Sequence, residues 1–204
     1  MKWFTSDWHL GEDRIGLDGK PNLFYRPFVD KFGSDDPERI IYLQNECIWA
    51  SFNSSFKDGD ELWHLGDVMY SERGESIEFL ESIRRKYPNS KFNLIAGNYD
   101  EDKIDKLKDY FDVVYEDYFV NFDFGRCYLN HYPVKCRDEV NKLHGQIQAW
   151  NFGITGHIHG LWKVQRNMIN VGVDAWHFKP VSEDEIKFCW NAMQNHYDEN
   201  VFPY

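Results

Sequence analysis

Short apolar runs, each followed by a glycine, asparagine or aspartate, recur along the chain and predict β-strands. They lie at residues 2–6, 61–65, 92–96, 151–155 and 169–173. The stretch 112–134 also has a strand pattern, and Asp123-Phe124-Gly125-Arg126 is typical of a hairpin turn within it. The chain therefore contains enough strand segments for a substantial sheet.

Four longer segments are predicted to be helical, and apolar residues at helical spacing mark the first two. The first begins at Asp36-Pro37, because Asp is a favoured N-cap and Pro is tolerated in the first turn. The last begins at Ser182, where Asp184 and Glu185 are placed for an N-terminal cap. The first predicted helix begins at Asp36-Pro37. The other three cover about 75–87, 101–110 and 182–194.

The order of these elements, βαβα followed by β-rich structure, predicts an α/β fold in which helices pack against a sheet. Residues 11–35 show no period, so we expect a long ordered loop, and long loops in compact domains are often functional. No internal repeat or Pro/Ser-rich linker divides the chain. Because 204 residues suit one domain, we expect a single domain over residues 1–204.

The chain is acidic, with 23 Lys and Arg against 34 Asp and Glu and a formal net charge of −11. This balance disfavours long nucleic acid as a partner, since no basic excess is available to displace counterions. A local groove for nucleic acid stays open as an alternative. With 42% apolar and 18% aromatic residues, the chain can bury a sizeable core, which excludes the disordered and disulfide-scaffold classes.

The four cysteines, Cys47, Cys127, Cys136 and Cys189, are widely spaced and form no CxxC pair. The first residues do not match a signal peptide, and no run approaches the roughly 20 apolar residues of a membrane span. We therefore expect a soluble protein of a reducing compartment with no membrane partner and no zinc site built on cysteines. The expected location is the cytoplasm, or the host cytoplasm if a phage encodes the chain.

Five predicted strands end beside side chains that can bind metal. The segments are Asp7-Trp8-His9, Gly66-Asp67, Gly97-Asn98-Tyr99-Asp100, Asn130-His131 and Gly156-His157-Ile158-His159. Strand ends in open α/β sheets converge on one crevice, and residues i and i+2 of an extended backbone point the same way. These side chains can therefore reach a common centre.

The set of ligand types points to transition metals. Carboxylate, imidazole and amide oxygen together suit Mn, Fe, Zn or Ni rather than Ca or Mg alone. The candidate ligands exceed what one ion needs, and they fit two ions about 3.5–4 Å apart that share Asp67. The candidates are Asp7, His9, Asp67, Asn98, His131, His157 and His159.

Each motif taken singly has a simpler explanation. Gly-Asp and Gly-Asn usually form turns, and His-x-His pairs occur on surfaces. The joint occurrence of all the motifs in order, each after a predicted strand, is what favours a metal centre.

This ordered set resembles the calcineurin-like metallophosphoesterase superfamily over residues 3–175. Three further segments are similar to a small bacterial and phage branch of it: Tyr25-Arg26-Pro27-Phe28, His64-Leu65-Gly66-Asp67 and Asn170-Val171-Gly172-Val173-Asp174-Ala175-Trp176. The resemblance implies an α/β fold made of a two-sheet β sandwich flanked by helices, with the site at the strand ends.

The resemblance also implies a division of the ligands between two ions. Asp7, His9, Asp67 and His159 would hold one ion, and Asp67, Asn98, His131 and His157 would hold the other. Two divalent transition-metal ions are expected, with Mn foremost and Fe, Ni or Zn as alternatives. A water that bridges them would lose a proton and attack phosphorus in line with the departing oxygen.

One position departs from the family pattern. Where the family usually has Gly-Asn-His-Asp or Gly-Asn-His-Glu, with a His that helps to protonate the leaving group, this chain has Tyr99. A phenol with an ordinary pKa of about 10 is a poorer acid than imidazolium, so monoesters should suffer most and diesters are favoured. The alternatives are that Tyr99 packs over the cleft and that Asp100 holds a loop.

The resemblance makes Asn98, Tyr99, Asp100 and His131 the candidate catalytic residues. Three side chains are candidates for substrate binding: Arg26, Tyr99 and His64. Arg26 could clamp a phosphate bidentately, or it could be a structural loop residue. Along the strand, His64 points to the opposite side from Asp67. The alternative to substrate binding is therefore that His64 lies in the core or supports the ligands from beside them.

The favoured interpretation is a dinuclear metal-dependent phosphoester hydrolase that acts on a small nucleotide-type phosphodiester, for example a cyclic one. A phosphomonoesterase or a nuclease of the same superfamily is the first alternative. A non-catalytic binding scaffold with a vestigial metal site is an alternative from another class, although all seven ligand positions are intact. The sequence does not indicate an oligomeric state.

Overall fold

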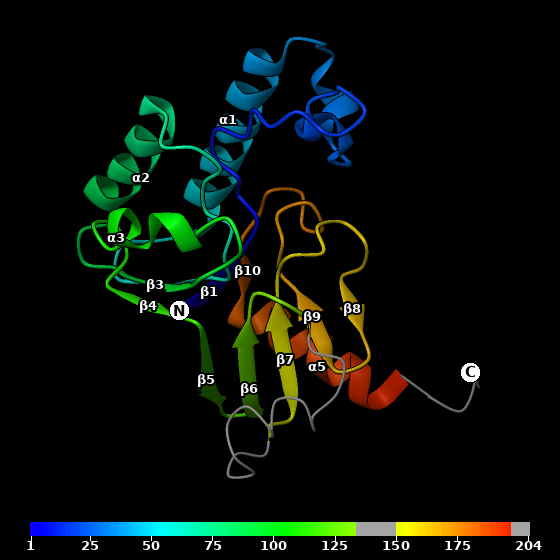
Figure 1. The fold of residues 1–204 in the computed structure, drawn as a ribbon. Coiled ribbons are helices and arrows are strands. Elements are labelled where there is room, and N and C mark those ends of the chain that lie inside the picture. The colour runs from blue at the N-terminus through cyan, green and yellow to red at the C-terminus, as the bar shows by residue number, and fades with distance from the viewer. Residues whose placement is uncertain (134–149, 197–204) are drawn as a thin grey trace.

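Two sheets lie at the centre of the computed structural model, which describes residues 1–133 and 150–196. Within these residues each sheet has five strands, in the orders β10-β1-β2-β3-β4 and β5-β6-β7-β9-β8. Helices flank the sheets (Figure 1). The predicted two-sheet α/β architecture is therefore confirmed.

The first sheet has a parallel body and one antiparallel edge. Its strands are β1 (Lys2–Thr5), β2 (Glu61–His64), β3 (Lys91–Ile95) and β4 (Val113–Tyr115), which run parallel, and β10 (Val181–Ser182), which runs antiparallel to β1. The register pairs Thr5 with His64 and His64 with Leu94. Strands β1, β2 and β3 therefore end side by side, and the residues that follow them leave the sheet at one edge.

The second sheet begins with the predicted hairpin. Its strands are β5 (Asp117–Phe122), β6 (Gly125–Asn130), β7 (Phe152–Thr155), β8 (Val164–Gln165) and β9 (Met168–Asn170). Strands β6, β7 and β9 run parallel. A bridge between Ser6 and Gly172, with the Val173 N–H donating to the Ser6 carbonyl at 3.1 Å, joins the two sheets just beyond β1 and β9.

Alternation along the strands of the first sheet divides the core in two. Leu62 and Phe92 belong to a cluster under the helices, whereas Phe4 and Trp63 face the second sheet. The flanking helices are α1 (Pro37–Ser55), α2 (Gly74–Lys86), α3 (Ile104–Leu107) and α5 (Glu183–His196). Helix α5 adds Ile186 to the cluster between the sheets, so both layers are anchored to one core.

The predicted helix caps are present. Asp36 accepts a hydrogen bond from the Glu38 N–H at 3.2 Å ahead of α1. At α5, the Glu185 carboxylate accepts from the Ser182 N–H at 2.8 Å, and the Glu185 N–H donates to the Ser182 hydroxyl at 3.2 Å. This reciprocal pair is a capping box, and it starts the helix at the expected place.

Other predictions need correction. The helix expected at 101–110 is a 3₁₀ turn, η3 (Glu101–Lys103), followed by the short α3. The predicted β stretch is split between the sheets, with β4 in the first and the β5–β6 hairpin in the second. The two-residue strands β8 and β10 were not expected, because two residues carry no recognisable period.

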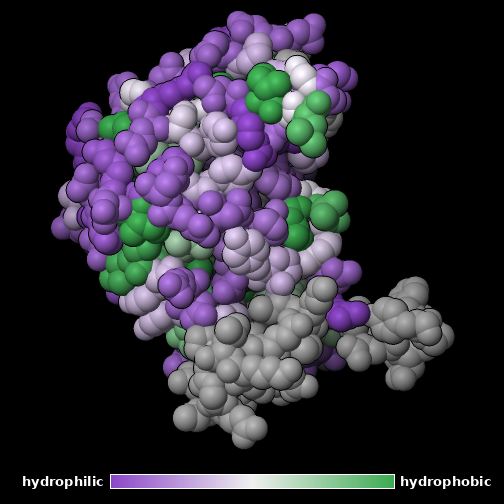
Figure 2. Space-filling model, viewed as in Figure 1, coloured by the Kyte–Doolittle hydropathy of each residue, from purple (hydrophilic) through white to green (hydrophobic). Residues whose placement is uncertain are grey.

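The expected loop at 11–35 contains two short 3₁₀ helices, η1 (Asn22–Tyr25) and η2 (Val29–Phe32), and an isolated bridge between Ile15 and Pro21. Cys47, Cys127 and Cys189 are free thiols, and Cys136 lies outside the described residues. None of the described helices is long and apolar enough to span a membrane. On the face shown in Figure 2, hydrophobic side chains form small separate patches on a mostly hydrophilic surface.

Candidate metal centre

The ends of six strands meet at the seam between the two sheets. Strands β1, β2, β3, β6 and β7 lead into the five predicted motifs, and β9 leads into a sixth segment that contains Asp174. Backbone hydrogen bonds hold neighbouring segments together, for example from the Asp7 N–H to the Gly66 carbonyl at 3.0 Å and from the His9 N–H to the Asp67 carbonyl at 3.0 Å. The predicted convergence of strand ends is thus present in the fold.

Close approach of these segments depends on glycine at two positions. A Cβ added to Gly97 would lie 2.3 Å from Asp67 Oδ1, and one added to Gly156 would lie 1.9 Å from Ser6 Oγ and 2.9 Å from Asp7 Oδ2. Real Cβ atoms do not come so close to other atoms. The glycine of each motif therefore makes room for a ligand-bearing segment.

The ligand segments are not extended. Five of the seven predicted ligands have a left-handed backbone, with φ of 59° at Asp7, 47° at His9, 57° at Asp67, 71° at His157 and 51° at His159. Such conformations are uncommon outside glycine, and they concentrate at functional sites. The expectation that an extended i, i+2 spacing would align the pairs is wrong, because the chain turns at each of these residues.

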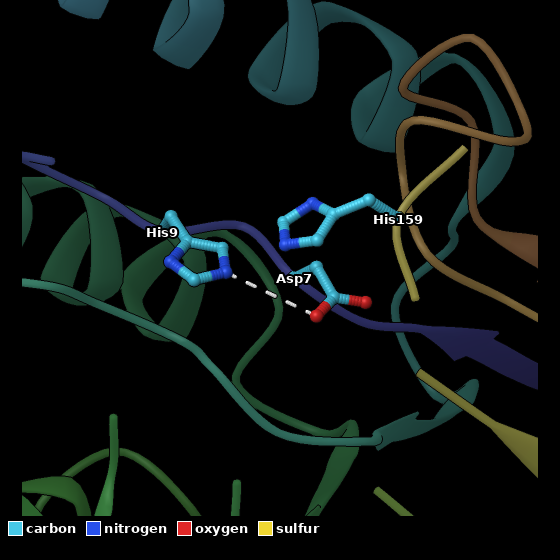
Figure 3. Close-up of side chains that lie close together, drawn as sticks. All are labelled: Asp7, His9 and His159. Atoms are coloured by element: carbon cyan, nitrogen blue, oxygen red, sulfur yellow. Dashed lines mark ion pairs between the residues drawn. The ribbon is translucent and has the colours of Figure 1, made fainter. Parts of the chain in front are cut away.

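The first group of candidate ligands consists of Asp7, His9 and His159. One ligand atom from each lies within 4.8 Å of the others, and Figure 3 shows the three side chains pointing into one shared space. Asp7 and His9 are buried, with His9 Nε2 3.9 Å from Asp7 Oδ1.

The second group consists of Asp67, His131 and His157, whose ligand atoms also lie within 4.8 Å of one another. Asn98 belongs beside it, because its Oδ1 lies 3.2 Å from His131 Nε2 and 3.2 Å from His157 Nδ1. The two histidines of the His157-x-His159 motif therefore fall in different groups. The resemblance implies the same grouping of side chains, and the binding of an ion by each group stays a prediction.

Asp67 lies between the two groups. Its Oδ2 is 3.4 Å from His9 Nε2 and 3.4 Å from His131 Nε2, so one carboxylate oxygen faces a histidine of each group. Its Oδ1 accepts a hydrogen bond from the Tyr99 N–H at 2.9 Å, which fixes the carboxylate. This placement suits a ligand shared by two cations.

The donor atoms fit metal ions. Neither ring nitrogen of His9 has a hydrogen-bond partner among the described residues, although the side chain is only 2% exposed. Burial, reinforced by the positive charge of Arg26, holds the pKa of His9 well below its ordinary value. A buried, neutral imidazole with a ring nitrogen free to coordinate is what a metal ligand requires.

His131 is oriented by the backbone. Its Nδ1 lies 2.7 Å from the Leu65 carbonyl, which can only accept, so Nδ1 carries a proton and Nε2 is the nitrogen that would face a metal ion. Burial would lower the pKa of His131, but Asp67 and Asp7 outweigh it and raise the pKa to about 9. The carboxylates thus favour positive charge at this place.

Arg26 is engaged by the protein itself. Its Nε and Nη2 donate to Asp174 Oδ1 and Oδ2 at 3.1 and 3.0 Å, and Nη2 also donates to the Asp7 carbonyl at 2.7 Å. Asp174 in turn contacts His159 Nδ1 at 2.6 Å. In the sequence, Asp174 was noted only as part of segment 170–176, which is similar to the bacterial and phage branch. Its contact with His159, a candidate ligand, forms only in the folded chain.

Asp100 anchors the ligand loops. Its carboxylate accepts backbone hydrogen bonds from Asp67 at 2.8 Å, Val68 at 2.9 Å and Gly97 at 2.9 Å. Burial raises its pKa to about 6, and these hydrogen bonds act in the opposite direction. Among the alternatives for this predicted catalytic residue, the geometry matches the one in which Asp100 holds a loop.

Tyr99 packs beside the first group. Its ring centroid is 5.1 Å from that of His9, in an edge arrangement, and the Arg14 guanidinium lies 4.9 Å above the Tyr99 ring. His64 is fully buried, with its ring 4.6 Å from Trp8 and 6.1 Å from Phe111. We therefore place His64 in the apolar core, where no substrate reaches it, and correct its predicted substrate-binding role.

A cavity of about 490 Å³ opens beside the ligand groups. Residues of the 11–35 loop form one wall, and residues 157–161 form the other. The lining side chains are Glu12, Arg14, Asn22, Arg26, Pro27, His157, Ile158, His159 and Leu161. Nothing in the sequence pattern pointed to Glu12, which is buried with Oε2 3.7 Å from His9 Nδ1.

No family model matches the chain, and no curated protein does. Its structure is similar to that of a protein of unknown function from Aquifex aeolicus, with a TM-score of 0.66, 25% identity, and coverage of 92% of this chain and 98% of that one. Weaker likenesses are to a nuclease MPE from Pseudomonas putida (TM-score 0.46, 16% identity, 78% and 60% covered) and to Vacuolar Protein Sorting 29 from Cryptosporidium parvum (0.38, 15%, 83% and 72%).

The chain shares its two-sheet α/β fold with the Aquifex aeolicus protein over nearly the whole length of both chains. Its candidate metal-ligand groups lie after β1, β2, β3, β6 and β7, where the sequence motifs predict them.

Proposed function

We propose that this chain is a dinuclear metal-dependent phosphoesterase that favours a small phosphodiester of the nucleotide type. The observation that carries the proposal is the position of Asp67, whose Oδ2 faces His9 of the first group and His131 of the second at 3.4 Å each. A scaffold has no need for two converging ligand groups that share one carboxylate oxygen. When bound, two divalent cations would neutralise the phosphoryl oxygens and supply an activated water.

The chain's own residues would bind and orient the substrate around this centre. Asn98 and His131 lie together at the second group, where a phosphoryl oxygen would enter. The buried carboxylates of Asp7 and Asp67 would bind the cations directly, and the bound cations would supply the positive charge that an acidic chain otherwise lacks for a phosphate. The cations, rather than a basic surface, would therefore attract the substrate.

The cavity supports a substrate with an organic substituent. A volume of about 490 Å³ is within the range of small-molecule sites, and its walls combine apolar groups with the charged Arg14. It borders both His157 and His159, so a group attached to phosphorus would extend into it. Inorganic phosphate would leave this space unfilled.

The test is metal content together with turnover. Purified protein should bind two equivalents of Mn per chain and hydrolyse aryl phosphodiesters faster than aryl phosphomonoesters. Chelation and His131→Ala should each abolish turnover. A folded protein that binds no metal and turns over neither ester would support the scaffold alternative.

A second screen addresses the substrate. Cyclic nucleotides and short single-stranded oligonucleotides are compared at equal phosphodiester concentration with Mn present. Faster hydrolysis of the cyclic nucleotides is expected from the net charge of −11, which disfavours a long polyanion. Preferential cleavage of the oligonucleotides would favour the nuclease alternative.

A further inference from the structure

A buried arginine from the 11–35 loop reaches two of the three residues of the first group. Arg26 donates directly to the main-chain carbonyl of Asp7 at 2.7 Å. It also forms a bidentate ion pair with Asp174, and the two side chains are 4% and 0% exposed. Arg26 is therefore linked both to the segment that carries Asp7 and to the segment that follows β9.

Asp174 carries this link to His159. Its Oδ2 is 2.6 Å from His159 Nδ1, and because a carboxylate only accepts, Nδ1 must be the protonated nitrogen. The lone pair of Nε2 is then free for a metal ion. Asn170 holds the same segment, donating from Nδ2 to the His159 carbonyl at 2.7 Å. Both the ring and the backbone of His159 are thus fixed from behind.

The second group is supported in another way. The Nδ1–H of His131 donates to a backbone carbonyl, that of Leu65, at 2.7 Å. Asp67 is held by the Tyr99 N–H. These contacts belong to the strand ends themselves, and they do not involve the Arg26–Asp174 pair.

We propose that Arg26 and Asp174 are positioning residues that act as one unit on the first group. Together they set the affinity of Asp7, His9 and His159 for a metal ion and leave the second group unaffected. The inference rests on the proposed metal centre, and it assigns Arg26 to the support of the ligands in place of direct contact with phosphate.

The physical basis is orientation. A carboxylate behind a metal-binding histidine fixes its tautomer and raises its basicity, and loss of such a partner typically lowers metal affinity about 10–100-fold. A lysine at position 26 would keep the charge but lose the two parallel hydrogen bonds of the guanidinium. Two variants should therefore weaken the Arg26–Asp174 pair to different degrees, Asp174→Asn more and Arg26→Lys less.

The experiment isolates each group before testing the pair. In a His131→Ala background only the first group is complete, and in a His9→Ala background only the second is complete. Mn²⁺ affinity is measured by calorimetry in each background, with and without Asp174→Asn or Arg26→Lys. The matched control is Arg84→Lys, which breaks a bidentate pair with Asp112 at the far end of β3.

In the His131→Ala background, Asp174→Asn should weaken Mn²⁺ binding about 10–100-fold and Arg26→Lys by a smaller factor. In the His9→Ala background both should change it less than about twofold, as should Arg84→Lys in either background. Equal weakening in both backgrounds, or none in either, would overturn the inference. If the unsubstituted protein binds no Mn²⁺, the proposed function fails first, and the inference fails with it.

A second measurement does not depend on metal or on Asp174→Asn remaining folded. Nitrogen-15 NMR of the histidine rings in the metal-free protein should show His159 with the proton on Nδ1. Arg26→Lys should shift this tautomer toward a mixture and leave His131 unchanged. An Nε2–H tautomer of His159 in the unsubstituted protein would contradict the proposal.

Discussion

The two ligand groups differ in burial and in what supports them. The first group has no exposed member, and a chain of buried charged side chains stands behind it. The second includes the exposed His157, and backbone groups at the strand ends orient it. We infer that the first group is held rigidly by its neighbours and that substrate and solvent reach the centre at the second group.

The largest effect should come from the residue that the two groups share. Asp67→Asn removes a negative charge from between His9 and His131, so metal content should fall from two equivalents to at most one. Turnover of an aryl phosphodiester should drop at least about a thousandfold, since both cations stabilise the developing charge. Metal analysis and steady-state kinetics check this.

The control for that variant is Asp105→Asn, which changes a carboxylate that is 99% exposed. It should leave metal content and turnover unchanged. If Asp67→Asn retained two metal equivalents and most of its activity, Asp67 would not be shared by the two groups. The two groups would then have no ligand in common.

A smaller effect is expected at the seam between the sheets. Gly156→Ala would place a Cβ 1.9 Å from Ser6 Oγ and 2.9 Å from Asp7 Oδ2, so either the seam or the first group must shift. We expect the free energy of unfolding to fall by about 3 kcal/mol, as for overpacking in a tight core. Urea denaturation measures this loss.

Gly74→Ala is the matched control, because Gly74 begins α2 and a Cβ there meets nothing within 4 Å. It should change stability by less than about 1 kcal/mol, in the stabilising direction. A Gly156→Ala protein as stable as this control would show that the two sheets are not tightly joined behind Asp7.

The convergence of the candidate ligands could be predicted from the sequence because each follows a strand. Parallel strands end at one edge, so a motif after β1 and a motif after β2 must be neighbours even though they are some 60 residues apart in the chain. The same reasoning could not tell that the backbone turns into the left-handed region at Asp7 or His157, because that depends on packing at the seam.

The contacts behind the candidate ligands could not be predicted, although Arg26 was already a candidate residue. Arg26 and Asp174 are separated by 148 positions, and Arg26 lies in a loop that has no period. Either residue taken alone is an ordinary polar side chain. The fold buries both charges, so each must be compensated by its neighbours. This burial is what gives the two residues a role. Asp100 could be named as important for the site, but its three backbone contacts came from the structure.

Removal of metal should sharpen the comparison further. With a chelator in excess, the ion at the second group should leave about tenfold faster than the ion at the first, a difference equivalent to about 1.4 kcal/mol. The reason is that solvent and chelator reach the exposed His157, whereas Asp7 and His9 are buried. Stopped-flow chelation should therefore show two phases of equal amplitude. A single phase would mean that burial does not separate the two groups.

The smallest effect concerns Tyr99, which contacts both groups: its ring lies against His9, and its N–H holds Asp67. Tyr99→His would place a better proton donor beside the first group, so the ratio of aryl monoester to diester turnover should rise, by roughly fivefold.

Tyr99→Phe separates the two interpretations of this residue. It keeps the ring packed beside His9 and removes only the hydroxyl. If the phenol donates a proton, Phe should slow alkyl esters more than aryl esters, because a basic alkoxide needs the proton most. If the ring only packs, Phe should change neither rate, and His at this position should leave the ratio as it was.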